Sequence, residues 1–528
     1  MDQSKPTILF ETEGSYPYSG GGVSTWAHIL CSELEEDVNF ILLALTGAPF
    51  VESRYRLTSN ITDIIHVPLW GVEEPISYFD EETPFSEHIM RKSQTKRNAV
   101  EKDFLPMFRD FLDRLFDTSQ PARESGELIY GFWKFFQHHD YKKTLSDPRL
   151  WTEFKRRLQR YLQLSESFTE AEEPRMLDVT FGMRWLYHFM MPLAVSIPKV
   201  SATHATLAGF PAIASIAAKF EYGTPMVVTD HGVFIRERLI NVSQADMPFF
   251  SKKLLVNLAT FMTRAVYHFA DLIAPVTSIN AKWEKEFDAP EERIDPIYNG
   301  VDTEQFRPQP KPEHTKGRPT VVAVAHVFPL KDVETMIRSC DLVRREIPDV
   351  QYIIYGSLEV DKEYVAKCRN LVDELDLGDH FTFGGYHDTP SKIFNEGDIS
   401  ILSSISEGFP YTVLESMSCA RPVVATDVGG VSEAVEGCGI VCKPRDARDL
   451  AEGVIKLLED DDLRIELGRK SRSRVLLKYT IPKSVNNYHE VYKKFHQQEH
   501  HPLKKELTVD SVKEMLSRLQ EQGVATNG

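Results

Sequence analysis

The chain has 528 residues, of which 42% are hydrophobic and 26% are charged, and its formal net charge is −17. This length favours more than one domain, and the acidic balance argues against a general nucleic-acid binder or a binder of anionic membranes. The six cysteines form no paired C-x-x-C set, the N-terminal apolar run is too short for a signal peptide, and no segment approaches the ~20 apolar residues of a transmembrane helix. We therefore expect a globular, cytoplasmic protein with buried thiols and no metal site.

Short apolar runs alternate with helical patterns through most of the N-terminal half of the chain. Strands are predicted at 7–10, 38–45, 63–69, 199–203, 225–229, 271–276 and 294–298. Helices are predicted between several of them, as at 207–220, which is rich in small residues, and at 251–270. Strands that alternate with helices in this way are typical of an open α/β sheet.

Between about 73 and 192 the strand signals vanish and charged helical sequence replaces them. Apolar residues recur at helical spacing from Phe104 to Phe116, and an aromatic run follows at 131–136. A partner or membrane surface is one interpretation, but stripes of this kind are more often buried. We therefore predict a helical insertion that packs on the α/β domain.

The proline-rich segment 306–319 reads as a linker. A second α/β series begins at Thr320, and its helices continue to about 479. The predicted fold class is α/β, with two doubly wound, Rossmann-like domains facing a cleft. The predicted division is a first domain at 1–305, a linker at 306–319, a second domain at 320–479, a helix at 480–497 and a polar tail at 498–528.

The most informative stretch runs from Asp398 to Val431 and reads as a strand, a loop, a helix and a second strand. In the loop, Gly408 allows close approach of a ligand, and Pro410 suits the first helical position. The free amides at the start of this helix would bind an anion. Glu407 and Glu415 flank that site, and carboxylates bind sugar hydroxyls rather than phosphates. A phosphate flanked by polyol groups describes a nucleotide sugar. The alternative is that Glu407 only neighbours a helix cap and Glu415 is a solvated helix residue.

Four other candidates lie where predicted strands end. Gly21 and Gly22 follow the first strand and could approach a phosphate, although a plain tight turn is an equal alternative. Lys331 lies at a strand-to-helix turn and could neutralise a diphosphate, or it could be a surface lysine. His204 and His231 each follow a strand and could bind or deprotonate a hydroxyl. For His204, a structural role is an equal alternative to a functional one. His231 is the better functional candidate, because Asp230, Gly232 and Arg236 lie in the same turn.

Together these pieces resemble glycosyltransferase family 4, which has the GT-B fold. The matching sequence is Asn299 to Asp302 with Phe306, Phe328 to Lys331, Ser406 to Pro410 with Glu415, and Gly429 to Glu433. Three further features resemble the Pel exopolysaccharide glycosyltransferases more specifically. These are Gly14 to Tyr18 with Gly21 to Trp26, Asp230 to Arg238, and the helical insertion.

The resemblance implies roles for the candidate residues. His231, Glu407 and Lys331 would be catalytic, and His204 and Arg236 would lie on the acceptor side. The donor and its nucleotide would contact Gly21, Gly22, His326, Lys331, Tyr386, Glu407, Gly408, Phe409, Pro410, Tyr411 and Glu415. Within this set, Glu415 would hold the ribose, Glu407 the donor sugar, and Lys331 the diphosphate. The family retains anomeric configuration, needs no metal, and uses the leaving phosphate as base. Its final helix crosses back onto the first domain.

We therefore expect an enzyme that moves a sugar, glucose or a related hexose, from a UDP-sugar to a growing exopolysaccharide or other glycan acceptor. Membrane-bound polysaccharide synthesis and secretion proteins are the expected partners, with recruitment to the inner face of the membrane, and no nucleic acid is expected. Two alternatives stay open: a non-catalytic nucleotide-sugar-binding subunit of a secretion complex, and a UDP-sugar 2-epimerase. The first is favoured by one departure, because many family members carry Gly-Arg where this chain has Ala325 and His326. A neutral histidine donates to a diphosphate more weakly than an arginine.

Overall fold

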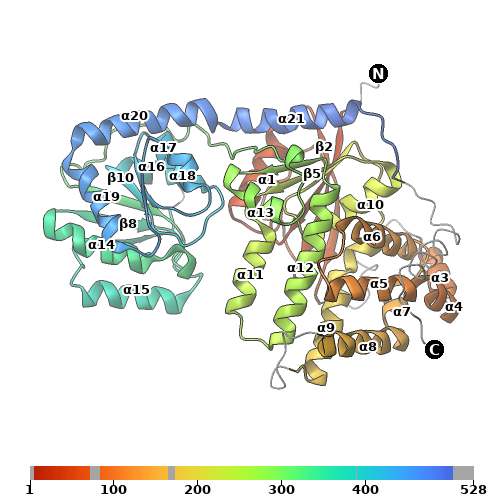
Figure 1. The fold of residues 1–528 in the computed structure, drawn as a ribbon. Coiled ribbons are helices and arrows are strands. Elements are labelled where there is room, and N and C mark those ends of the chain that lie inside the picture. Colours follow the sequence, from red (N-terminus) through yellow and green to blue (C-terminus); the bar gives the residue numbers. More distant parts are fainter. Residues whose placement is uncertain (1–4, 72–83, 165–172, 388, 504–528) are drawn as a thin grey trace.

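The computed structural model describes residues 5–71, 84–164, 173–387 and 389–503. It contains two parallel six-stranded sheets that lie side by side (Figure 1). The first sheet has the order β3-β2-β1-β4-β5-β6, and the second has the order β12-β11-β10-β7-β8-β9. In each sheet the chain starts in the middle, winds to one edge and returns to fill the other, so the prediction of two doubly wound α/β units is confirmed.

The strands are short, as in most parallel sheets covered on both faces. Those of the first sheet are β1 (Thr7–Glu13), β2 (Asn39–Thr46), β3 (Ile61–Pro68), β4 (Ala202–Ala205), β5 (Met226–Asp230) and β6 (Leu272–Pro275). Those of the second are β7 (Thr320–Val324), β8 (Gln351–Tyr355), β9 (Phe381–Gly385), β10 (Ile399–Leu402), β11 (Val423–Thr426) and β12 (Ile440–Cys442). Consecutive apolar residues such as Ile8, Leu9 and Phe10 are fully buried, because helices cover both faces.

The predicted strand at 294–298 is wrong. This segment runs beside β6, and the amides of Asp295 and Ile297 donate to the carbonyls of Ile273 and Pro275 at 2.9 and 3.0 Å. Pro296 lies between them and has no N–H, so the segment forms only one isolated bridge, between Ile273 and Ile294.

Helices cover both sheets. Around the first sheet lie α1 (Gly22–Glu33), α10 (Ile213–Tyr222), α11 (Phe234–Gln244), α12 (Phe249–Phe269) and α13 (Ala281–Glu286). Around the second lie α14 (Val333–Glu346), α15 (Lys362–Glu374), α16 (Pro390–Glu396), α17 (Tyr411–Ser418), α18 (Val431–Val435), α19 (Ala447–Glu459) and α20 (Asp461–Lys478). No helix in the described ranges is both long and apolar enough to cross a membrane. All six cysteines are buried free thiols, as predicted.

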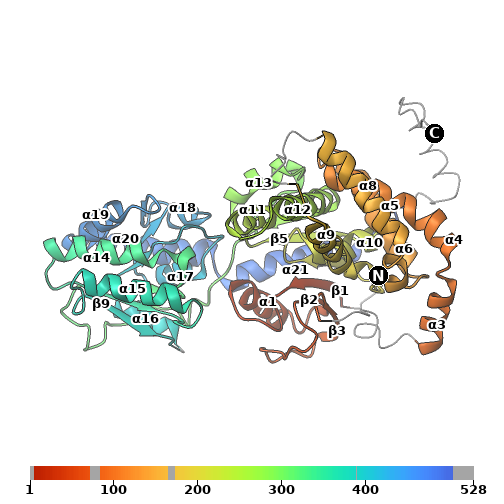
Figure 2. The same cartoon turned by 90° about the horizontal axis from the view of Figure 1, so that it is seen from below.

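A group of helices between β3 and β4 lies at the end of the first sheet that is remote from the second sheet (Figure 2). They are α3 (Phe85–Gln94), α4 (Arg97–Ala99), α5 (Leu105–Phe116), α6 (Ala122–Phe136), α7 (Tyr141–Leu145), α8 (Pro148–Leu164) and α9 (Met176–Phe189). The predicted aromatic stripe is buried: Phe104 and Phe108 are fully inaccessible, and Phe132 is 2% exposed. Tyr130 stacks on Phe220 of α10 with ring centroids 5.2 Å apart. The prediction of core packing for these aromatic residues is therefore confirmed. The expected start of the insertion, near residue 73, lies outside the described residues.

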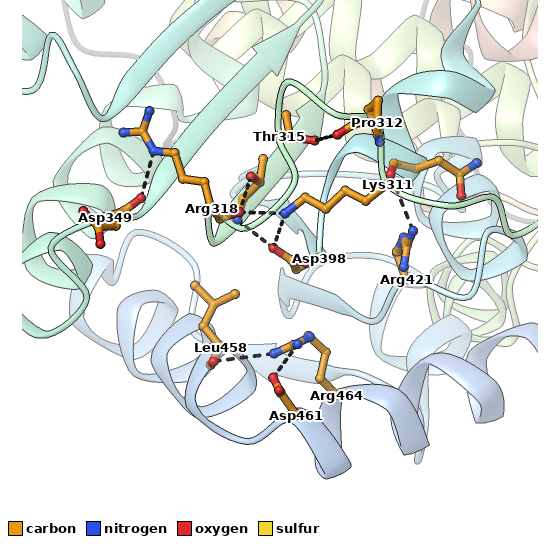
Figure 3. A network of polar contacts seen from close by, with 12 residues as sticks. Lys311, Pro312, Thr315, Arg318, Asp349, Asp398, Arg421, Leu458, Asp461 and Arg464 are labelled. Carbon is orange, nitrogen blue, oxygen red and sulfur yellow. Dashed lines mark hydrogen bonds and ion pairs between the residues drawn. The ribbon is translucent and has the colours of Figure 1, made fainter.

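The proline-rich segment 306–319 is fixed to the second sheet's domain along its length (Figure 3). The ammonium group of Lys311 lies 2.7 Å from the Asp398 carboxylate, which also accepts from the amide of Thr320 at 2.8 Å. Arg318 donates to the carbonyl of Asp349 at 2.9 Å, and Arg421 donates to the carbonyl of Gln309 at 3.1 Å. The linker segment is therefore ordered and bound to the second sheet's domain.

The helix α21 (Ile481–Gln497) returns to the first sheet, so that α20 and α21 span both halves of the molecule (Figure 1). Its buried Tyr488 and Tyr492 pack in the same cluster as Trp26 and Phe10. The predicted final helix is thus confirmed. We propose the domain division 1–305, 306–319, 320–479 and 480–497, and refer below to the first and second domains. The structure describes the predicted tail (498–528) only as far as residue 503, and the rest lies outside the described residues.

Candidate active site

A cavity of about 770 Å³ lies where the carboxyl ends of the two sheets face each other. Residues after β1, β4 and β5 form its first-domain wall, and residues after β7, β8 and β10 form its second-domain wall. Ligands of open parallel sheets bind at this edge. Of the residues predicted for the site, His204, Arg236 and Glu415 do not line the cavity, and the others do: Gly21, Gly22, His231, His326, Lys331, Tyr386, Glu407, Gly408, Phe409, Pro410 and Tyr411.

Lys331 and Glu407 form an ion pair in the second-domain wall. The Lys331 Nζ lies 2.5 Å from Glu407 Oε1, which also accepts a hydrogen bond from the Ser404 hydroxyl at 2.6 Å. Lys331 ends a short 3-10 turn (Pro329–Lys331), and Asp332 follows with a left-handed backbone (φ 45°). The Asp332 side chain accepts from the amide of Thr335 and caps α14. The turn therefore holds the ammonium group in the cavity beside a single carboxylate.

His326 lies beside this pair in a cationic environment. Its Nδ1 accepts a hydrogen bond from the amide of Ser357 at 3.1 Å, so the neutral ring carries its proton on Nε2. Burial lowers the pKa of His326, and the charges of Lys331 and Arg54 lower it further. The ring is therefore a neutral donor at physiological pH. Arg54, which reaches this region from the first domain, could not be predicted from the local sequence pattern.

Gly408 lies where the two domains touch. A Cβ atom at position 408 would lie 1.9 Å from the backbone carbonyl oxygen of His231. The carbonyl oxygen of Gly408 accepts a hydrogen bond from the amide of Gly430 at 2.7 Å. Gly408, which was predicted to allow close approach of a ligand, therefore also allows close approach of the first-domain backbone at His231. Arg236 donates to the Ser406 hydroxyl at 3.0 Å, so it bridges the domains instead of lining the cavity.

Glu433, at the end of the Gly429 to Glu433 motif, also joins the domains. One of its oxygens accepts from the Thr277 hydroxyl at 2.5 Å and from the amide of Ser278 at 2.9 Å. The other accepts from the Tyr298 hydroxyl at 2.5 Å. This carboxylate therefore holds α18 of the second domain against the first domain.

The helix α17 begins at Tyr411, and Pro410 is its N-cap with an extended backbone, one position earlier than predicted. Glu415 lies one turn into this helix, partly buried, and burial raises its pKa to about 7. It does not reach the cavity wall, and among the described residues no side chain or amide hydrogen-bonds to its carboxylate.

His231 lies at the end of β5 against Trp26, with ring centroids 4.4 Å apart. Burial lowers its pKa to about 3, so the imidazole is neutral. Its Nε2 atom is buried and has no hydrogen-bond partner among the described residues. The preceding Asp230 is fully buried, bonds to the Tyr267 hydroxyl and accepts from the amide of Ala208 at 3.2 Å. Burial raises the pKa of Asp230, and this anchored residue fixes the turn that carries His231.

The expectation that His204 lies on the acceptor side is not supported. It is fully buried, and its Nδ1 lies 2.6 Å from the Tyr492 hydroxyl while its Nε2 lies 2.8 Å from the Thr229 hydroxyl. Both ring nitrogens are thus satisfied by the protein. His204 attaches α21 to the first sheet, which is the structural alternative considered from the sequence.

Gly21 and Tyr386 line opposite parts of the cavity. Gly21 is the N-cap of α1 and has φ 129°, a backbone that favours glycine. It presents the free amides of α1 to the cavity. Tyr386, which follows β9, is 71% exposed, so its ring is available to a ligand.

Several lining residues of the first domain were not predicted from the sequence. They are Glu13, Ser15, Thr206 and Glu237. Each except Glu237 lies within two residues of a strand's carboxyl end, and that position was the available signal. Their proximity to one another depends on the strand order β1-β4-β5, which short-range spacing does not reveal.

Two family descriptions match the chain. Residues 6–292 match the domain of unknown function DUF3492, and residues 304–474 match glycosyl transferases group 1. Among curated proteins, the chain is 24% identical to N-acetyl-alpha-D-glucosaminyl L-malate synthase of Bacillus anthracis, over 42% of this chain and 59% of that protein. It is 30% identical to D-inositol 3-phosphate glycosyltransferase of Pseudarthrobacter chlorophenolicus, over 39% and 51%. The chain thus spans little more than half the length of these two relatives.

Solved structures show the same fold over nearly the whole chain. Anabaena HepE, crystallised with UDP, has a TM-score of 0.54 and 14% identity, covering 93% of this chain and 100% of that one. Sucrose-phosphate synthase of Thermosynechococcus elongatus has a TM-score of 0.55 and 16% identity, covering 93% and 99%. The predicted GT-B fold is therefore confirmed. The chain therefore belongs to the DUF3492 family, its residues 304–474 match the glycosyl transferases group 1 model, and it has the GT-B fold.

Proposed function

We propose that the protein transfers a sugar, glucose or a related hexose, from a UDP-sugar to a growing exopolysaccharide or another glycan acceptor, with retention of configuration and without a metal. The observation that carries this proposal is the ion pair of Lys331 and Glu407, 2.5 Å apart in the cavity between two doubly wound domains. One group suits a phosphate and the other suits a hydroxyl, so a donor with both is expected beside them.

The second-domain wall suits the diphosphate of the donor. Lys331 supplies a full charge, and the neutral His326 supplies an Nε2–H donor. The start of α1, at Gly21 and Gly22, faces them from the first domain with free amides. We propose that Glu415, behind this wall, receives the ribose hydroxyls. Support for UDP as the nucleotide comes from HepE, whose structures include complexes with UDP and UDP-glucose.

In the proposed reaction, the bond between the anomeric carbon and the β-phosphate oxygen breaks, and the electron pair leaves with UDP. An acceptor hydroxyl oxygen forms its bond to the same carbon on the same face. Its proton passes to an oxygen of the leaving phosphate. Lys331 stabilises the charge that develops on that phosphate, and the neutral His231 contacts the reacting centre. Glu407 orients Lys331 and contacts the donor sugar.

The features shared with the Pel exopolysaccharide enzymes support an exopolysaccharide as the acceptor. We propose that the enzyme works in the cytoplasm and is recruited to the inner face of the membrane by polysaccharide synthesis and secretion proteins. The net charge of −17 opposes direct binding to anionic lipids, which favours recruitment through such protein partners.

The test is to incubate the purified protein with UDP-glucose and related UDP-sugars, with and without glycan acceptors, in the presence of EDTA. Transfer of the sugar to a glycan with retained configuration supports the proposal. Conversion of the UDP-sugar into a UDP-bound epimer in the absence of acceptor would identify an epimerase. Tight binding of UDP without turnover under all conditions would identify a non-catalytic subunit.

A further inference from the structure

The first-domain wall of the cavity carries polar atoms that have no partner in the protein. The oxygens Glu13 Oε2, Ser15 Oγ and Thr206 Oγ1 are buried and accept or donate no hydrogen bond among the described residues. All three residues line the cavity, and Thr206 is only 2% exposed. A polar group that is removed from water without a hydrogen-bond partner destabilises the protein. Several such groups on one wall indicate a surface that a ligand completes.

These groups are held by rigid backbone. Glu13 ends β1, Thr206 follows β4, and the two strands are hydrogen-bonded neighbours. The amide of Thr206 donates to the carbonyl of Glu11 at 3.0 Å, and the amide of Gly14 donates to the carbonyl of Leu45 at 2.9 Å. The carbonyl of Ser15 closes a turn by accepting from the amides of Tyr18 and Ser19. The three side chains are therefore pre-positioned, which lowers the entropy lost on binding.

The chemistry of this wall is acidic and hydroxylic. Glu13 and Glu237 both line it, and on the first-domain side no lysine or arginine of the described chain does so. Arg238 lies 3.9 Å from Glu13 Oε1 outside the cavity lining, which leaves Glu13 Oε2 for a ligand. Carboxylates accept hydrogen bonds from hydroxyls and repel anions. The second-domain wall, with Lys331 and His326, has the opposite character.

We propose that Glu13, Ser15 and Thr206 form an acceptor subsite for the neutral, hydroxyl-rich end of a glycan, and that this subsite rejects uronate and other anionic sugars. The inference rests on the proposed sugar transfer and adds to it the chemical class of the acceptor. The unpartnered Nε2 of His231, at the end of the adjacent strand β5, faces the same cavity. The subsite therefore borders the proposed reacting centre.

The test uses the full-length chain with UDP-glucose as donor. Neutral oligosaccharides of several linkages, including cellotetraose and maltotetraose, are compared with tetragalacturonate. Transfer to at least one neutral oligosaccharide is expected, with at least tenfold lower kcat/KM for tetragalacturonate. Thr206→Val and Glu13→Gln preserve side-chain shape, and each should raise the acceptor KM about 5- to 10-fold while UDP affinity stays unchanged. The matched controls are Thr62→Val on the edge strand β3 and Glu33→Gln at the end of α1, both at exposed positions outside the cavity.

Equal or better transfer to tetragalacturonate would overturn the inference. It would also be overturned if no neutral oligosaccharide is a substrate, or if Thr206→Val, Glu13→Gln and Ser15→Ala all leave the acceptor KM unchanged in correctly folded protein. These outcomes differ from failure of the proposed function. If the proposed function is wrong, the wild-type protein will neither bind UDP nor hydrolyse UDP-glucose when water is the only acceptor. The acceptor subsite would then be rejected together with the proposed function.

Discussion

The two walls of the cleft are prepared for ligands in different ways. In the second-domain wall, Lys331, Glu407 and Ser404 are already bonded to one another. In the first-domain wall, Glu13, Ser15 and Thr206 have buried oxygens without partners. A charged group left unpaired in a partly buried site is costly, so a cation that waits for a diphosphate needs an internal partner. Hydroxyl groups such as those of Ser15 and Thr206 are cheaper to leave without a partner, and the charge of Glu13 has Arg238 3.9 Å from its other oxygen. The comparison suggests a preformed donor site and an acceptor site that is completed by its ligand.

The largest effect is expected for His231→Ala, at the boundary between the walls. The neutral imidazole belongs to the first domain and contacts the proposed reacting centre, so its loss should lower kcat about 10²- to 10³-fold. UDP affinity should stay within a few-fold of wild type, because the proposed nucleotide contacts lie mainly on the second domain. The measurements are steady-state kinetics and calorimetric UDP titration. An equal fall in UDP affinity and turnover would place His231 in the donor site instead.

Lys331→Ala should weaken UDP binding about 10- to 150-fold, since it removes a charge-assisted bond worth ~1.5–3 kcal/mol. It also leaves the Glu407 carboxylate unpaired beside the phosphates. Lys456→Ala, at an exposed position on α19, is the matched control and should bind UDP normally. Calorimetry that finds the same affinity in both variants would contradict the phosphate role of Lys331.

The ion pair of Lys331 and Glu407 leads to a third prediction, about transfer rate and about the additivity of two substitutions. Glu407→Gln should slow transfer about 10- to 100-fold, because a carboxylate near the sugar acts mainly as positive charge develops there. The two substitutions should not be additive: Lys331→Ala should weaken UDP binding less when Glu407 is already Gln, by ~0.5–3 kcal/mol of coupling. A double-mutant cycle of UDP affinity measures this coupling. Strict additivity would mean that the ion pair does not set the charge of the donor wall.

Site residues that are close together in the sequence could be predicted, whereas contacts between residues far apart in the sequence could not. Glu407, Gly408 and Pro410 follow one another at a strand end, and local spacing sufficed to find them. The contact between Lys331 and Glu407 joins residues 76 positions apart, and the wall of Glu13 and Thr206 depends on the order of the strands. Neither can be predicted from spacing alone.

The errors also have local physical causes. His204 follows the predicted strand 199–203, but in the structure it lies within β4, and the Tyr492 hydroxyl from the far end of the chain bonds to its Nδ1. The predicted strand at 294–298 contains Pro296, whose missing N–H breaks the ladder. The two doubly wound sheets were predictable because alternating apolar runs and helices leave few other folds.

The smallest effect concerns pH. Burial raises the pKa of Glu415 to about 7, and its ionised form accepts stronger hydrogen bonds from ribose hydroxyls than its protonated form does. As pH rises from 6 to 8 the ionised fraction grows, so UDP affinity should increase by up to about tenfold. By linkage, UDP binding should release a proton near pH 7. UDP itself titrates in this range, so the comparison is with Glu415→Gln, which should lack this component. Identical pH profiles for both proteins would show that Glu415 does not meet the ribose.

The most direct test of the division between the walls is to titrate UDP and uridine into the wild-type protein and two variants. Uridine lacks the diphosphate, so the ratio of the two affinities isolates the phosphate contacts. The account predicts that UDP binds at least tenfold more tightly than uridine to wild type and to Glu13→Gln, and that this preference is largely lost in Lys331→Ala. It would be contradicted if wild type binds UDP and uridine equally, or if Glu13→Gln loses the preference while Lys331→Ala keeps it.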